Sequence, residues 1–137
     1  MKTVFDSSSF AKRYIAEAGS DQVDEILQNT TELGLSVLCF PEIVSALNRR
    51  VREEVMPAAG YEQAKAQLTA DVGDAIVLQL APTVVAMAVT LLENNILRAM
   101  DALHLAGALV WQADLFVTAD RQQFAAARQS GLNSELV

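Results

Sequence analysis

The sequence is 137 residues long, 52% apolar and 20% charged, with a formal net charge of −7. This composition excludes a disordered chain and fits a single domain, residues 1–137, with a substantial core. The acidic balance argues against a simple nucleic-acid-binding module, but it permits an enzyme whose carboxylates gather divalent cations.

The first expected element is a short strand that ends at an acid. The apolar, β-favouring run 3–5 is followed directly by Asp6. Ser7–Ser9 can then cap a helix that continues over residues 10–15. In a parallel sheet Asp6 would lie at the carboxyl end of its strand, where open α/β sheets bind ligands. The alternative is that Asp6 only caps the helix.

The next strand-to-helix joint also carries an acid. Residues 35–38 read as a second strand, and Pro41 suits the first position of the helix that follows. Glu42 then falls in the first turn of that helix. The helix macrodipole favours acids at this position, so Glu42 also has a purely structural interpretation.

The rest of the chain predicts two further buried strands, an edge strand and four helices. The expected strands are 75–80, 115–118 and 133–137, and the apolar run 75–80 is alternatively a buried helix segment. The expected helices are 61–72, 82–94, 98–112 and 120–127.

Two of these helices also begin with an acid. Asp101 lies in the first turn of a nearly all-apolar helix, where a carboxylate is costly to bury unless it is paired, hydrogen-bonded or bound to metal. His104 lies one turn further on, and we interpret it as a packed, hydrogen-bonded residue, because hard cations prefer oxygen ligands. Asp120 directly follows the strand 115–118 and repeats the joint seen at Asp6.

The four acids Asp6, Glu42, Asp101 and Asp120 are expected at one edge of the sheet, because right-handed crossovers bring parallel joints together. Such a cluster repels itself, and all-oxygen ligation selects Mg²⁺ or Mn²⁺. Two such ions about 3.5–4 Å apart hold a phosphodiester and lower the pKa of water. The pattern alone therefore predicts a metal-dependent phosphodiesterase or phosphatase.

The sequence also resembles the PIN-domain family, and within it the VapC-type toxin ribonucleases of toxin–antitoxin pairs. The resemblance covers essentially the whole chain and is carried by Asp6-Ser7-Ser8, Glu42 after Phe40-Pro41, residues 98–109 around Asp101, and residues 116–121. It implies a three-layer α/β/α fold with a mostly parallel sheet of four to five strands. It also implies a Mg²⁺- or Mn²⁺-dependent endoribonuclease toxin that hydrolyses RNA phosphodiester bonds with metal-activated water, forms a homodimer and is blocked by a VapB-type antitoxin.

The resemblance assigns roles to individual residues. Asp6, Glu42, Asp101 and Asp120 match the family's metal-binding and catalytic acids, and Ser8 and Thr118 match hydroxyls that support the site. The chain departs from the family where Ser7 replaces a commoner threonine and where Arg121 stands in place of a further acid found in some relatives. The candidate phosphate contacts, which are alternatively solvated surface charges, are Lys12, Arg13, Arg98 and Arg121.

Other functions remain open as alternatives. A haloacid-dehalogenase-like phosphatase requires a second aspartate where Ser8 stands, and a receiver domain requires one where the run 75–80 ends at Leu80. A non-catalytic PIN-like binding module would be expected to have lost one of the four acids, and all are present.

Three further expectations concern compartment, assembly and stability. The single cysteine, Cys39, has no disulfide partner, and no signal peptide or membrane span is visible, so we expect a cytoplasmic protein. The helices 61–72 and 84–92 carry more apolar residues than one sheet face covers, which favours a dimer. Asp6→Asn or Asp101→Asn is expected to abolish cleavage and to leave the metal-free protein at least as stable, because clustered carboxylates repel one another.

Overall fold

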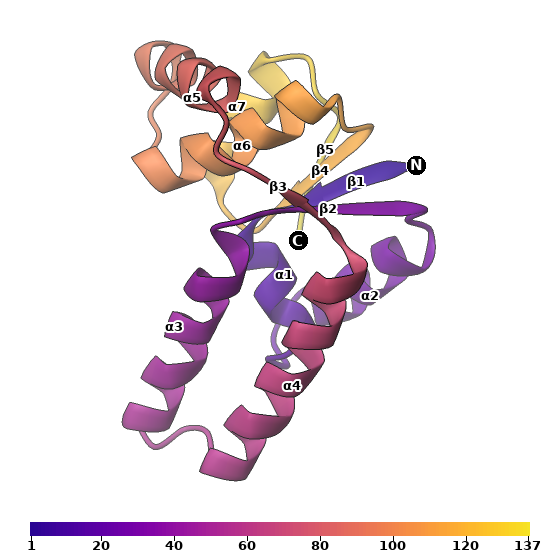
Figure 1. The fold of residues 1–137 in the computed structure, drawn as a ribbon, viewed down its shortest axis with the longest axis vertical. Coiled ribbons are helices and arrows are strands. Elements are labelled where there is room, and N and C mark those ends of the chain that lie inside the picture. The colour runs from indigo at the N-terminus through magenta and orange to yellow at the C-terminus, as the bar shows by residue number, and fades with distance from the viewer.

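Five strands form a central sheet in the order β3-β2-β1-β4-β5 (Figure 1). The computed structural model describes residues 1–137. The strands are β1 (Lys2–Phe5), β2 (Glu32–Ser36), β3 (Ile76–Leu78), β4 (Leu115–Thr118) and β5 (Ser134–Leu136). Every neighbouring pair is parallel. The prediction of a mostly parallel sheet of four to five strands, including an edge strand near the C-terminus, is confirmed.

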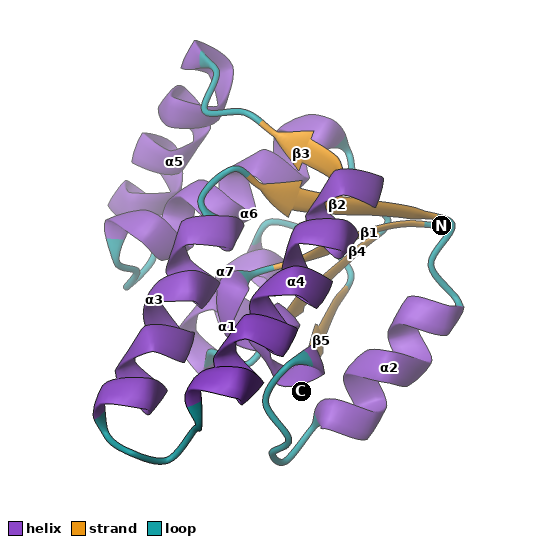
Figure 2. Ribbon diagram, turned by 60° about the horizontal axis from the view of Figure 1, so that its bottom comes forward, coloured by secondary structure: helices purple, strands orange, loops and turns teal.

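Helices cover both faces of this sheet, so the predicted three-layer α/β/α architecture is confirmed. In Figures 1 and 2, α5, α6 and α7 lie on one side of the sheet, and the helices of the first half of the chain lie on the other. The helices are α1 (Ser7–Phe10), the 3₁₀ helix η1 (Ala11–Arg13), α2 (Ser20–Gln28), α3 (Cys39–Arg52), α4 (Ala58–Asp74), α5 (Pro82–Asn94), α6 (Ala99–Trp111) and α7 (Arg121–Gln129). None of them combines the length and apolar character that crossing a membrane requires.

The core is divided between the two faces, and adjacent residues of β1 serve opposite halves. Val4 packs with buried side chains of α5, α6 and α7, whereas Phe5 packs with those of α1, α2, α3 and α4. Phe116 and Val117 divide in the same way on β4. Because successive side chains of a strand point to opposite faces, a strand covered on both sides must be apolar throughout. This explains why the strands read as short apolar runs.

The chain order creates a switch point between β1 and β4. From β1 the chain moves outward through β2 to β3, and it then returns to the other side of β1 with β4. Open parallel sheets bind ligands beyond the carboxyl ends of the strands at such a point. The joints that follow β1 and β4 therefore occupy the position where a site is expected.

Three predicted boundaries were wrong. The first helix covers Ser7–Phe10 and tightens into η1 instead of continuing to residue 15, as helix ends commonly do. The second strand covers Glu32–Ser36, since the Ser36 hydroxyl accepts a hydrogen bond from the Leu38 backbone and turns the chain. Helix α3 consequently begins at Cys39 rather than at Pro41. Glu42 still lies in its first turn, as predicted.

Candidate functional site

Two of the four acids, Asp6 and Asp120, lie at the switch point, after the neighbouring strands β1 and β4. Asp6 follows β1 directly, and Asp120 lies two residues beyond β4, the parallel neighbour of β1. The backbone N–H of Asp6 donates to the Val117 carbonyl at 3.1 Å, which fixes the two joints against each other. Both carboxylates therefore start from the same edge of the sheet.

Asp6 is almost fully buried, at 3% exposure, and caps α1. Its Oδ1 accepts from the Ser9 backbone N–H at 3.0 Å and from the Ser9 hydroxyl at 2.8 Å. Its Oδ2 accepts from the Ser8 hydroxyl at 2.6 Å, and Ser8 in turn accepts from the Ala119 backbone N–H. The capping alternative is thus correct for Asp6, and the same three donors hold the carboxylate in one orientation. Ser8 supports Asp6 directly; Ser9 was not identified from the sequence.

Asp120 repeats this arrangement at the start of α7. Its Oδ1 accepts from the Gln123 backbone N–H at 2.8 Å, and its own N–H donates to the Thr118 hydroxyl at 3.0 Å. Thr118 donates to the fully buried Gln123 side chain at 2.6 Å, and the Gln123 amide donates to the Asp101 carbonyl at 3.0 Å. Gln123 therefore ties the Asp120 joint to the first turn of α6. Sequence reasoning missed this role, although a glutamine three residues after a capping acid is the capping-box pattern.

Glu42 is held to α1 by Ser7 and to α6 by His104. Its Oε1 accepts from the Ser7 hydroxyl at 2.7 Å and contacts His104 Nε2 at 2.5 Å. Burial raises the pKa of Glu42, but the hydrogen bonds from His104 and Ser7 outweigh it and lower the pKa overall. The interpretation of His104 as a packed, hydrogen-bonded residue agrees with this geometry. Ser7, which is next to Asp6, connects the α1 and α3 joints.

Asp101 is the least neutralised of the four acids. Its pKa is raised, first by burial and then by the charges of Asp120 and Asp6, while Arg98 at 3.4 Å opposes the shift. Arg98 itself is 85% exposed, so water screens most of its effect. The negative charges of Asp120 and Asp6 therefore act on the Asp101 carboxylate and disfavour its ionisation.

Comparison with known proteins identifies the fold. No protein-family model matches the sequence, and no curated protein matches it either. Solved structures do match. A chain of VapBC2 from Rickettsia felis, bound to a DNA fragment from its promoter, superimposes with a TM-score of 0.70 at 14% identity, covering 100% of this chain and 99% of that one.

Two further structures agree with this match. VapC20 of Mycobacterium tuberculosis, a Sarcin-Ricin loop cleaving toxin, gives a TM-score of 0.71 at 16% identity over 90% of this chain and 94% of that one. PAE2754 of Pyrobaculum aerophilum gives a TM-score of 0.68 at 20% identity, covering 98% of this chain and 90% of that one. The chain has the fold of a VapC-type PIN domain.

The acid cluster of this VapC-type fold fits a hard divalent cation by its donor chemistry. The four acids offer oxygen ligands, and burial together with the charges of Asp120 and Asp6 raises the pKa of Asp101, a shift that a bound cation would oppose. No three side chains of His, Cys, Asp or Glu lie close enough together to hold one ion by themselves. Mg²⁺ is ordinarily bound by one or two carboxylates together with water and substrate phosphate, so this spacing agrees with its habits.

The four predicted phosphate contacts fall into two pairs. Lys12 donates to the Ala18 carbonyl and pairs with Glu17 at 3.6 Å, and Arg13 pairs with Asp71 at 2.8 Å, so both are engaged within the α1–α4 side of the molecule. Arg98 and Arg121 are exposed at the starts of α6 and α7, the helices that carry Asp101 and Asp120. Of the four, Arg98 and Arg121 are therefore the two that lie on the helices carrying Asp101 and Asp120.

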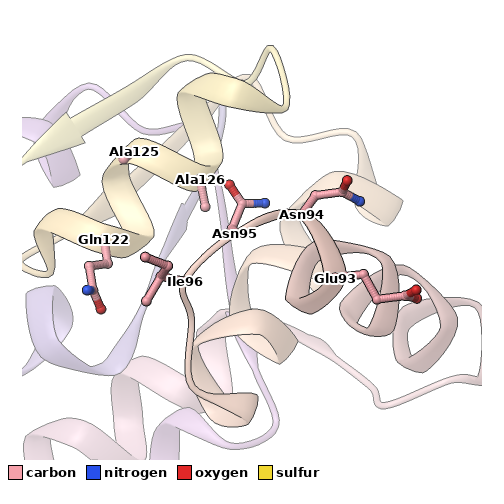
Figure 3. Close-up of a pocket in the computed structure, with 7 residues that line it drawn as sticks. All are labelled: Glu93, Asn94, Asn95, Ile96, Gln122, Ala125 and Ala126. Carbon is pink, nitrogen blue, oxygen red and sulfur yellow. The ribbon is translucent and has the colours of Figure 1, made fainter.

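An open pocket of about 540 Å³ lies beside the cluster, between the end of α5, the α5–α6 loop and α7. Figure 3 shows Ile96 projecting from that loop toward Gln122 of α7. None of the four acids lines this pocket, which is formed by Glu93, Asn94, Asn95, Ile96, Gln122, Ala125 and Ala126. The pocket is therefore separate from the four acids.

Proposed function

We propose that this chain is a Mg²⁺- or Mn²⁺-dependent endoribonuclease, the toxin of a toxin–antitoxin pair. The observation that carries the proposal is the placement of the acids: Asp6 and Asp120 at the switch point, with their charges acting on Asp101. VapC20, a Sarcin-Ricin loop cleaving toxin of the same fold, supports RNA as the substrate. An RNA-cleaving activity also accounts for an acidic protein that meets phosphate through cations.

The chain's own groups have distinct tasks in this proposal. The candidate ligands are the carboxylates of Asp6, Asp101 and Asp120 and the free Oε2 of Glu42. One or two of them, together with water and substrate phosphate, would hold a cation that stabilises negative charge on the phosphodiester and lowers the pKa of water. Ser8 and Thr118 keep the Asp6 and Asp120 joints in place through the hydrogen bonds described above. Arg98 and Arg121 meet the RNA phosphates at the rim, where arginine forms charge-assisted hydrogen bonds.

An antitoxin of the VapB type is the proposed partner, because the structures of the same fold include VapBC complexes. An acidic cluster offers such a partner a simple means of inhibition. An arginine or lysine of the antitoxin would bind the carboxylates in place of the cation through charge-assisted hydrogen bonds.

A second copy of the chain is the proposed occupant of the apolar face of α5. Val85, Val89 and Leu92 are exposed at helical spacing on α5, and Ile96 in the loop that follows α5 is 81% exposed. None of the large apolar residues of α4 is exposed to this degree, so the apolar surplus expected on both helices is present on α5 alone. A self-complementary apolar stripe is the usual basis of a two-fold dimer.

The activity is tested by incubating the purified protein with RNA in Mg²⁺ or Mn²⁺, with and without EDTA. Asp101→Asn should abolish cleavage, and Glu62→Gln, which changes an exposed acid of α4, should leave it intact. Cleavage that persists in EDTA, or that survives Asp101→Asn, would contradict the proposal. RNA binding without cleavage under any metal condition would instead indicate a non-catalytic module.

A further inference from the structure

Glu42 is held through only one of its two carboxylate oxygens. Oε1 lies 2.5 Å from His104 Nε2 and 2.7 Å from the Ser7 hydroxyl, which donates to it. The Ser7 oxygen is itself 3.2 Å from His104 Nε2, so the three groups form a closed triangle. Oε2 makes no hydrogen bond or ion pair with the protein. One oxygen is therefore fixed, and the other is left available.

The surroundings of His104 determine how it contacts Glu42. The ring is 2% exposed, and its Nδ1 is buried without a hydrogen-bond partner. A proton on Nδ1 would be a buried, unpaired donor, which costs more than an unpaired lone pair on a neutral ring. The geometry therefore favours the tautomer with its proton on Nε2. In that form the only hydrogen bond available to the ring is donation toward Glu42 and Ser7.

We propose that His104 is a positioning residue that, together with Ser7, fixes Glu42 Oε1 and presents Oε2 to a divalent cation. This inference rests on the proposed metal-dependent activity and assigns a task to the one histidine of the chain, which is not itself a ligand. Hydrogen-bond partners of ligating carboxylates orient them, and losing such a partner typically weakens metal binding by about 10–100-fold.

A purely structural role predicts a different result. If His104 only satisfied a half-buried carboxylate, its replacement would lower stability and leave the cation affinity of the folded protein unchanged. The two roles are separated by measuring Mn²⁺ affinity and thermal stability on the same variants, without reference to RNA cleavage.

The experiment uses isothermal titration of Mn²⁺ into the metal-free protein and thermal unfolding in EDTA. His104→Leu removes the donor and keeps an apolar side chain of similar volume. His104→Gln can return an amide N–H near the position of Nε2. Leu105→Val is the matched control, because Leu105 is the next residue on α6 and is also fully buried. Its side chain packs in the half of the core between the sheet and α5, α6 and α7.

His104→Leu is expected to weaken Mn²⁺ binding about tenfold or more, and His104→Gln to return it to within about threefold of the wild type. Leu105→Val should lower the melting temperature without changing the Mn²⁺ affinity. Wild-type Mn²⁺ affinity in His104→Leu overturns the inference while leaving the proposed function intact. If the wild type itself binds no Mn²⁺, the proposed function fails first, and that result is distinguishable. If His104→Leu does not fold, Ser7→Ala is the deciding variant. Weaker Mn²⁺ binding by Ser7→Ala supports the proposal that Ser7 and His104 together fix Glu42 Oε1, and unchanged binding overturns it.

Discussion

Replacing Asp6 and Asp101 by asparagine should affect stability in opposite directions. Sequence reasoning treated both acids alike, as members of a repelling cluster. The structure separates them: Asp6 accepts three hydrogen bonds from Ser8 and Ser9, whereas Asp101 has only the long contact to the exposed Arg98. The amide introduced by Asp6→Asn would keep Oδ1 for Ser9 but would turn an N–H₂ group toward the Ser8 hydroxyl.

The magnitudes follow from these contacts. Asp6→Asn removes the carboxylate oxygen to which the Ser8 hydroxyl donates, so it loses about one hydrogen bond to a charged group, roughly 1.5–3 kcal/mol. Asp101→Asn removes a charge that burial and the neighbours Asp120 and Asp6 disfavour. We expect a change between zero and a gain of about 1 kcal/mol for Asp101→Asn. The two variants should thus differ by at least about 1.5 kcal/mol, which corresponds to about 6 °C in melting temperature for a domain of this size.

The assay is urea unfolding in EDTA at pH 7, followed by fluorescence of Trp111, the only tryptophan. Glu62→Gln is the control for removing an exposed acid. The pKa of Asp101 is raised in the folded state, so ionisation of Asp101 destabilises the fold. This destabilisation is absent below the ordinary aspartate pKa and is complete once the pH exceeds the folded pKa. The advantage of Asp101→Asn should therefore shrink on acidification. A loss of more than about 1 kcal/mol in Asp101→Asn, or an Asp6→Asn variant as stable as wild type, would refute the reasoning.

Three further results are expected. Glu42→Gln should destabilise the metal-free protein at pH 7, and the difference should disappear as the pH falls through the folded pKa of Glu42, which lies below its ordinary 4.5; unfolding in urea at several pH values measures this. Val89→Glu should convert a dimer to a monomer in light scattering, whereas Gln67→Glu on the exposed side of α4 should not; a wild-type monomer would contradict the proposed dimer face. At constant ionic strength, raising Mg²⁺ should weaken inhibition by the antitoxin. Inhibition that is independent of metal would show that the antitoxin covers the RNA path without entering the acid cluster.

The strands and the placement of the acids were predictable because they depend on local patterns. A run such as 3–5 followed by Asp6 specifies a buried strand and a capped helix with few alternatives. The contacts of Ser7 and His104 with Glu42 were not predictable in the same way. His104 and Ser7 are 62 and 35 residues from Glu42, and no spacing rule joins them. The tertiary arrangement brings the three side chains together: α1 and α3 follow the neighbouring parallel strands β1 and β2, and α6 packs against β2.

The wrong start predicted for α3 has a simple physical origin. Pro41 was taken as the first helical residue because proline suits that position, but the first four N–H groups of any helix lack partners. Proline is therefore also tolerated as the third residue of α3, where it stands. Gly34 illustrates a different limit, a tertiary contact that local sequence patterns do not reveal. A Cβ on this residue of β2 would lie 2.7 Å from the Trp111 ring, so close contact with α6 requires glycine there.

The hydrogen bonds of the four acids divide the cluster into a compensated side and an uncompensated side. Both oxygens of Asp6 and one oxygen of Glu42 accept short hydrogen bonds, which stabilise their charges. Asp120 has a single backbone donor, and Asp101 has only the exposed Arg98. A cation bound as proposed would be stabilised most beside Asp101 and Asp120, which have the fewest hydrogen-bond donors, and Asp6 and Glu42 would supply ligands already fixed in place. This division predicts that removing Asp101 costs the protein its affinity for cations, whereas removing Asp6 costs it both affinity and stability.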